Sequence, residues 1–223
     1  MIQRTALVHI NKLLKKKKHW KILDLGCNFD ANKYSTHVAD VVDFSSFYNG
    51  KKHFYLIKNN RLPFKKNFFD FVITSHVVEH VNNINFFLKE IQRVAQKGYI
   101  ELPTRFEDNI ILNSNNIKDH KWMFVFDDVK KELSYCKKKQ LISPFISLGL
   151  FLRSLRLHFR ESCVLELYWE KKIDIKKINL KYKKDHKLNL LIIFNKFFSY
   201  HIRKKKLFLI FILIFVIFII NRF

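Results

Sequence analysis

Between Lys21 and Pro103, short apolar runs alternate with polar turns. The runs have the length and composition of buried strands. Before the last run, apolar residues in Val81–Ala95 recur at helical spacing, and Asn82 or Asn83 is placed to cap the helix. A strand, a helix and a strand in this order imply a right-handed parallel crossover, so the sequence predicts an α/β sheet. The predicted strands are Ile22–Leu25, Val38–Val42, Phe54–Ile57, Phe69–Thr74 and Tyr99–Leu102, with a very short helix between the first two.

The segments on either side of this region have different patterns. Met1–Leu14 carries apolar residues at helical spacing and a run of lysines follows it, so we expect residues 1–20 to form a helix and a basic linker. Residues 21–185 are expected to form one domain with C-terminal additions. The predicted additions are a hairpin of Trp122–Phe126 and Leu133–Cys136, a helix over Leu141–Leu157 and a strand over Val164–Trp169.

The C-terminal segment is different in kind. Leu207–Ile220 is an unbroken run of aliphatic and Phe residues, with a basic cluster before it. As a helix it is about 21 Å long at 1.5 Å per residue, whereas the hydrocarbon core of a bilayer is about 30 Å thick. A short span with snorkelling lysines and a buried core element are the alternatives. We expect residues 186–223 to be a membrane-associating tail, single-pass or interfacial, with the domain on the cytoplasmic face because basic residues precede the run.

Charge and cysteine usage limit the class of protein. Lys and Arg number 42 against 19 Asp and Glu, a formal net charge of +23, which favours contact with nucleic acid or an anionic membrane surface. The sequence has no Asn-Pro-Pro-Tyr-type motif and no recognition module, so we disfavour nucleic acid. Three widely spaced cysteines without a CxxC pair exclude a disulfide framework and favour a reducing compartment.

Two acidic segments follow predicted strands. Asp24-Leu25-Gly26-Cys27-Asn28 ends the first strand, where a glycine turn lets the backbone approach a ligand closely. About 20 residues later Asp43 ends the second, the spacing at which a carboxylate reaches ribose hydroxyls in dinucleotide-type folds. The ring of Phe44 is placed to cover an adenine face. The pair predicts a nucleoside-containing ligand.

These segments belong to a longer ordered set, which resembles the class I S-adenosylmethionine-dependent methyltransferases with a methyltransferase type 11 domain. The resemblance covers Ile22–Pro103, and His120-Lys121-Trp122 is similar to a feature of a small bacterial subgroup. It implies a Rossmann-like methyltransferase sheet with flanking helices, to which we add a mixed β/α C-terminal extension and a hydrophobic C-terminal helix. The further matching segments are Leu62-Pro63-Phe64, Phe69–Ile73, Ser75–Val81 and Gly98–Pro103.

The resemblance also implies the cofactor, S-adenosyl-L-methionine, and its contacts. Two features depart from the family pattern: Asn28 and Asp30 stand at glycine positions, and Lys58–Arg61 replaces an acid that often contacts the adenine. Asn tolerates positive φ, so Asn28 is compatible with the turn. The implied contacts are Asp24, Gly26, Cys27 and Asn28 around the methionine part, Asp43 at the ribose, Phe44 and Asn59 at the adenine, and Ser75 with His76 beside the methyl group.

Three histidines are candidate general bases: His76, His80 and His120. Glu101 either holds the acceptor or is a solvated strand end. The segment from His76 to His80 also matches the H-x-x-E-H zinc pattern, which requires a helix and a third ligand. Because the segment follows a strand directly and precedes a turn, we expect no metal there.

The sequence therefore predicts a methyltransferase that uses S-adenosylmethionine. The tail favours a membrane-proximal acceptor, such as a lipid, a lipid-linked glycan or a quinone-like small molecule. The alternative is a catalytically degenerate Rossmann-like binding module tethered to a membrane, which the substitutions Asn28, Asp30 and Lys58 motivate.

Overall fold

The computed structural model describes residues 1–59, 61–110, 119–138 and 157–179, and for residues 109 and 110 only the backbone. Residues 141–156 of the predicted helix and the whole run Leu207–Ile220 lie outside this part of the chain. Among the helices that are described, none is both long enough and apolar enough to cross a bilayer.

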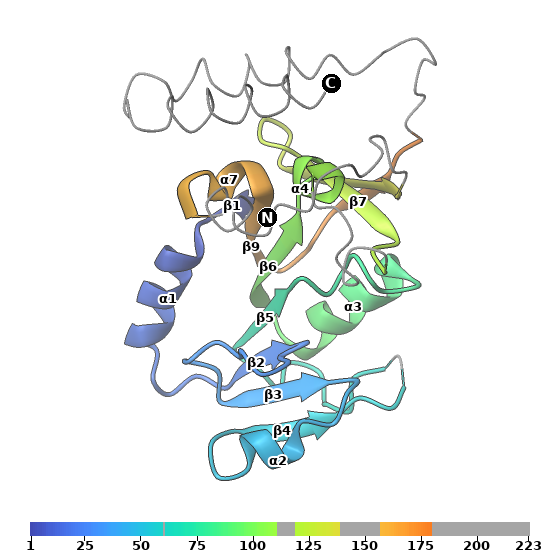
Figure 1. Ribbon diagram of the computed structural model, residues 1–223. Helices are drawn as coiled ribbons and strands as arrows, with labels where there is room; N and C mark the ends of the chain where they lie inside the picture. Colours follow the sequence, from blue (N-terminus) through green and yellow to red (C-terminus); the bar gives the residue numbers. More distant parts are fainter. Residues whose placement is uncertain (60, 111–118, 139–156, 180–223) are drawn as a thin grey trace, which may run out of the picture. The chain divides into compact units, whose positions relative to one another are not determined.

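Within the described residues, seven strands form one mixed sheet in the order β1-β9-β6-β5-β2-β3-β4 (Figure 1). The pairs from β6 through β4 are parallel, and β9 is antiparallel to both β6 and β1. Both the expected α/β sheet and the five predicted strands are confirmed. The strands are β1 (Ile2–Arg4), β2 (Ile22–Leu25), β3 (His37–Asp40), β4 (His53–Leu56), β5 (Phe71–Ser75), β6 (Lys97–Pro103) and β9 (Val164–Glu170).

The strand order reverses at β2. From β2 the chain adds β3 and β4 on one side, and then β5 and β6 on the other. In open α/β sheets a crevice forms at such a switch point, outside the carboxyl ends of the strands, and ligands bind there. The topology therefore directs the search for a site to the carboxyl ends of β2, β3 and β5.

Two helices cover opposite faces of the sheet, α1 (Leu7–Lys16) and α3 (Ile84–Val94) (Figure 1). Alternate residues of a strand face opposite sides, so each strand contributes to two cores. Ile10 and Leu14 of α1 pack with Ile22, Phe71, Ile73 and Tyr99. The apolar stripe of α3, Ile84, Leu88, Ile91 and Val94, packs with Leu23, Val72 and Ile100 on the other face.

The start of α3 is capped as the sequence predicts. The Asn83 side-chain oxygen accepts a hydrogen bond from the backbone N–H of Phe86 at 3.0 Å. This bond satisfies one of the backbone donors that the first turn of a helix leaves free.

The predicted hairpin is confirmed as β7 (Trp122–Asp127) and β8 (Glu132–Lys137), and β10 (Ile175–Lys177) joins β8 in parallel. In the part of the chain that the structure describes, three short helices accompany the two sheets: α2 (Ser45–Tyr48), α4 (Arg105–Ile110) and α7 (Arg160–Cys163). The predicted mixed extension after Pro103 is therefore present.

Three details of the sequence prediction are wrong. Ile2–Arg4 is not helical, because β1 pairs with β9 as an edge strand and buries Ile2 opposite Trp169. The link between β2 and β3 contains turns and no helix. Strand β3 ends at Asp40, since Val41 and Val42 leave the sheet and are 73% and 54% exposed.

Gly98 on β6 has no room for a side chain. A Cβ there would lie 2.5 Å from the Val72 carbonyl oxygen and 2.6 Å from Trp169 Nε1. We expect Gly98→Ala to lower the free energy of unfolding by about 1–3 kcal/mol, the usual range for overpacking. Chemical denaturation measures this change. The loss should shrink when Trp169→Phe removes the indole nitrogen, and an equal loss in both backgrounds would show that the indole contact is not its cause.

Candidate functional site

The turn after β2 has an unusual backbone. Gly26 has φ +78° and Asn28 has φ +43°, both in the left-handed region. A side chain at Gly26 would also overlap Val77, in the turn after β5. Asn28 therefore keeps the turn without a glycine, as the sequence analysis expected of an Asn at this position.

The loop that follows is held from two sides. Asp40, at the end of β3, accepts a hydrogen bond from the backbone N–H of Asn28 at 3.0 Å. The Tyr48 hydroxyl donates to the Asn28 carbonyl at 2.7 Å and accepts from the Ala31 N–H at 3.2 Å. Sequence reasoning missed Asp40 and Tyr48, although Asp40 stands where the buried run of β3 meets exposed residues.

Asp24 lies beneath this loop and is buried. Its Oδ2 accepts from the backbone N–H of Asn32 at 2.6 Å. Burial raises the pKa of the Asp24 carboxyl to about 7, against the hydrogen bond from Asn32 and the charge of Lys52, which lower it. Cys27 beside it is also buried, and burial raises the pKa of its thiol to about 12, so the thiol is inert.

The predicted adenosine-binding residues lie in the segments beyond the ends of β3 and β4. Asp43 is three residues beyond the end of β3 and exposed, and its carboxylate accepts from the Ser45 N–H at 2.8 Å. The Phe44 ring lies 4.6 Å from that of Phe29, between ring centroids, and Asn59 is exposed beyond β4. These side chains lie in the segments that follow β2, β3 and β4.

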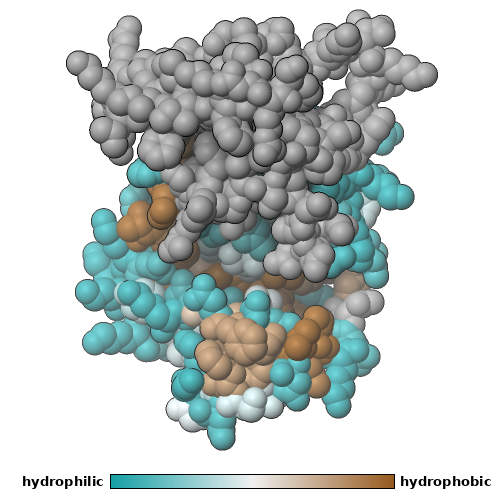
Figure 2. Space-filling model, in the orientation of Figure 1, coloured by the Kyte–Doolittle hydropathy of each residue, from teal (hydrophilic) through white to brown (hydrophobic). Residues whose placement is uncertain are grey.

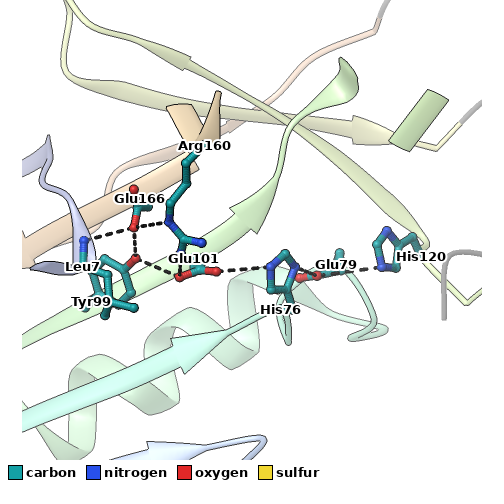
Figure 3. Close-up of polar contacts among 8 residues, drawn as sticks. All are labelled: Leu7, His76, Glu79, Tyr99, Glu101, His120, Arg160 and Glu166. Atoms are coloured by element: carbon teal, nitrogen blue, oxygen red, sulfur yellow. Dashed lines mark hydrogen bonds and ion pairs between the residues drawn. The ribbon is translucent and has the colours of Figure 1, made fainter. Parts of the chain in front are cut away.

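At the end of β5 a histidine joins two buried carboxylates (Figure 3). His76 follows Ser75 with φ +53°; its Nδ1 lies 3.2 Å from Glu79 Oε1 and its Nε2 lies 3.2 Å from Glu101 Oε1. Burial alone would lower the pKa of His76, but the hydrogen bonds to Glu101 and Glu79 raise it to about 9. The two buried carboxylates therefore favour the protonated form of His76 and hold its ring in place.

Glu101 continues the network away from His76. The Arg160 guanidinium bridges Glu101 Oε2 at 2.8 Å and Glu166 Oε1 at 2.9 Å. The Tyr99 hydroxyl lies 2.9 Å from the same two oxygens (Figure 3). Glu101 is thus buried and fully engaged, so the expectation of a solvated strand end is wrong. Arg160 is 59 residues away in the chain, and no local pattern pointed to it.

The other two predicted histidines lie on the far side of Glu79. His120 Nε2 is 3.8 Å from Glu79 Oε1, and His120 Nδ1 is 2.7 Å from Asp108 Oδ1 on α4. The rings of His80 and His120 meet edge to face at 4.7 Å between centroids. The segment from His76 to His80 is a turn, so the helical zinc pattern does not form. Sequence reasoning missed Asp108.

Ionisation of Asp24 generates a test of stability against pH. Its pKa in the folded chain, about 7, is above the ordinary aspartate value of 3.8, so its stabilising contribution is complete below about pH 4 and is lost as pH rises through about 7. We expect wild type to lose stability across this window relative to Asp24→Asn, by roughly 1 kcal/mol per pKa unit. Urea unfolding at several pH values measures the difference. Parallel curves for the two proteins would contradict the burial argument.

With this geometry in view, we compared the chain with known proteins. Residues 23–100 match the family model described as a methyltransferase domain. This segment begins in β2, ends in β6, and includes the turns that carry Gly26 and His76. The family match therefore covers the part of the chain in which the crevice lies.

A curated relative matches about half of this chain. An uncharacterised protein of Methanocaldococcus jannaschii is 35% identical over 112 residues, which are 46% of this chain and 49% of that one. The chain thus spans about half the length of the curated relative it matches.

Two solved structures align more broadly. A possible histamine N-methyltransferase of Thermotoga maritima has a TM-score of 0.44 at 11% identity, over 74% of this chain and 92% of that one. The PH0226 protein of Pyrococcus horikoshii has a TM-score of 0.42 at 15% identity, over 74% and 89%.

Residues 23–100, which include the switch point of the sheet, are therefore similar to a methyltransferase domain, in agreement with the resemblance that the sequence motifs carry.

Proposed function

We propose that this chain is an S-adenosylmethionine-dependent methyltransferase. One observation carries the proposal: the segment that matches the methyltransferase domain is the same segment that forms the switch point of the sheet. Ligands of open α/β sheets bind at this position. The cofactor supplies a methyl group on a sulfonium, which an acceptor takes by in-line displacement.

The chemistry of the residues at the crevice fits this cofactor. Gly26 leaves space for a close backbone approach, and the Asp24 carboxyl is buried beneath the loop that would face the methionine part. Asp43 offers a carboxylate that can accept from both ribose hydroxyls. Phe44 and Phe29 offer aromatic faces for the adenine. The chain therefore has a group for each part of the cofactor.

The acceptor side is assigned to the turn after β5. Methyl transfer needs alignment and exclusion of water more than it needs covalent chemistry. Both ring nitrogens of His76 are engaged, by Glu79 and by Glu101, so the ring is fixed in orientation and forms one wall of the proposed acceptor site. His80 and His120 complete the wall on the other side of Glu79.

Cofactor binding tests the proposal without knowledge of the acceptor. We expect S-adenosylhomocysteine to bind the full chain in isothermal titration calorimetry, and Asp43→Ala to weaken binding about 10–100-fold, since hydrogen bonds to a charged group contribute about 1.5–3 kcal/mol. Asp174→Ala, which removes an exposed carboxylate paired with Lys172, is the control and should bind as wild type does.

The alternative of a degenerate binding module makes the opposite prediction. If titration of S-adenosylhomocysteine gives no heat of binding although the chain has the circular dichroism spectrum of a folded protein, that result would favour the alternative. Equal weakening by Asp43→Ala and Asp174→Ala would mean that the ribose contact is misassigned.

We further propose that the acceptor is membrane-proximal. The sequence of the tail supports this, as does an apolar patch of the exposed side chains Phe29, Val41, Val42 and Phe47 with the half-buried Phe44. A compact hydrophobic area is visible low on the face in Figure 2, in the region of α2 and β4 in Figure 1. Lys51 lies over the Phe47 ring at 4.4 Å, and such mixtures of basic and apolar side chains suit an anionic interface.

Cosedimentation with vesicles that contain anionic lipid tests the membrane proposal. We expect the full chain to bind, and a chain ending at Asn179, the limit of the first compact unit, to bind at least about 10-fold more weakly because it lacks the 14-residue apolar run. The patch variant Val41→Ser with Val42→Ser should reduce the remaining binding further. If the full chain stays in the supernatant at low salt, the membrane assignment is wrong.

A further inference from the structure

We propose that Glu79, His80 and His120 bind a divalent transition-metal ion. Each residue offers one ligand atom, and these atoms all lie within 4.8 Å of one another. A tetrahedral zinc ion with bonds of about 2.0–2.1 Å holds its ligands roughly 3.3 Å apart, so modest side-chain rotation closes the site. The inference does not rest on the proposed methyl transfer, because it concerns binding of the ion alone.

The backbone on both sides of the cluster is fixed. The Lys121 N–H donates to the Glu79 carbonyl at 2.8 Å, and Trp122 Nε1–H donates to the Val81 carbonyl at 2.7 Å. These bonds hold the segment that carries His120 against the turn that carries Glu79 and His80. The third ligand that a zinc pattern requires therefore comes from a segment 40 residues later in the chain, as the sequence numbers show.

The hydrogen bond of His120 sets its tautomer. When Nδ1–H donates to Asp108 Oδ1 at 2.7 Å, the lone pair of Nε2 faces Glu79 Oε1 at 3.8 Å. Two acceptor atoms at this position repel each other unless a cation lies between them. A carboxylate that orients a histidine in this way is the usual support of a metal-bound imidazole.

The other oxygen of Glu79 also requires a partner. The Glu79 side chain has no exposed surface, and its Oε2 makes no hydrogen bond within the described part of the chain. His76 contacts only Oε1. A buried carboxylate oxygen without a partner is costly, and a metal ion satisfies it.

The ligand set indicates the class of ion. Two imidazoles and one carboxylate suit Zn²⁺, and the same set binds Fe²⁺ and neighbouring first-row ions. Oxygen-only sites for Ca²⁺ or Mg²⁺ have a different composition. Three protein ligands leave at least one position for water or a substrate oxygen, the arrangement of a catalytic site and not of a closed structural site.

Cobalt provides a direct spectroscopic test. We expect the full chain, stripped with chelator and purified, to bind one equivalent of Co²⁺ with visible d–d absorption, and excess Zn²⁺ to displace it. Glu79→Gln and His120→Asn should abolish the absorption. Asp108→Asn should weaken Co²⁺ binding about 10–100-fold, the usual effect of removing a carboxylate that orients a metal-bound histidine.

The control is His9→Asn, which removes an exposed histidine on α1 and should bind Co²⁺ as wild type does. Circular dichroism checks that each variant is folded. If the variants at Glu79 and His120 do not fold, the comparison of Co²⁺ binding between wild type and Asp108→Asn tests the site instead. Absence of a cobalt spectrum in wild type would mean that a proton on His120, and not a metal, separates it from Glu79. Equal loss in His9→Asn and His120→Asn would also overturn the site.

Discussion

The turn after β5 packs directly against the turn after β2, and the contact requires a glycine at position 26. Gly26 supplies both the left-handed backbone and the space that Val77 fills. With Val77 in this position, His76 also takes a left-handed conformation, and its ring enters between Glu79 and Glu101. The two turns therefore bring the loop that follows Gly26 and the histidine cluster to the same end of the sheet.

Buried carboxylates give this end of the sheet a charge opposite to that of the whole chain. The chain has a net charge of +23, yet Glu79, Glu101, Asp108 and Glu166 are each at most 6% exposed. Arg160 bridges Glu101 and Glu166, and His76 bridges Glu101 and Glu79. Glu79 and Asp108 share His120, and Lys138 Nζ also lies 4.0 Å from Asp108 Oδ1.

The sequence predicted what depends on local pattern. Apolar runs marked the buried strands, the 3.6-residue period marked α3, and Asn83 marked its cap, because each signal lies within a few residues of the structure it specifies. The ordered motifs around Gly26 and His76 lie directly after β2 and β5, on neighbouring strands at the switch point.

What the sequence did not predict depends on contacts between distant segments. Ile2–Arg4 is a strand because β9 pairs with it, and the helical spacing of the following residues masked it. Arg160 on α7 and Asp108 on α4 contact the cluster, and no local sequence pattern in either helix predicts these contacts. Val41 and Val42 have strong strand propensity, but the chain leaves the sheet after Asp40, and the Asp40 carboxylate holds the loop after β2 through the Asn28 N–H.

A crystal structure of the full chain with S-adenosylhomocysteine tests the central claim most directly. The account predicts density for the ligand at the carboxyl ends of β2, β3 and β5, with its methionine part beside Gly26 and its ribose at Asp43. Density at another edge of the sheet, or a crevice filled by side chains of this chain at saturating ligand, would contradict the assignment of a methyl-donor site.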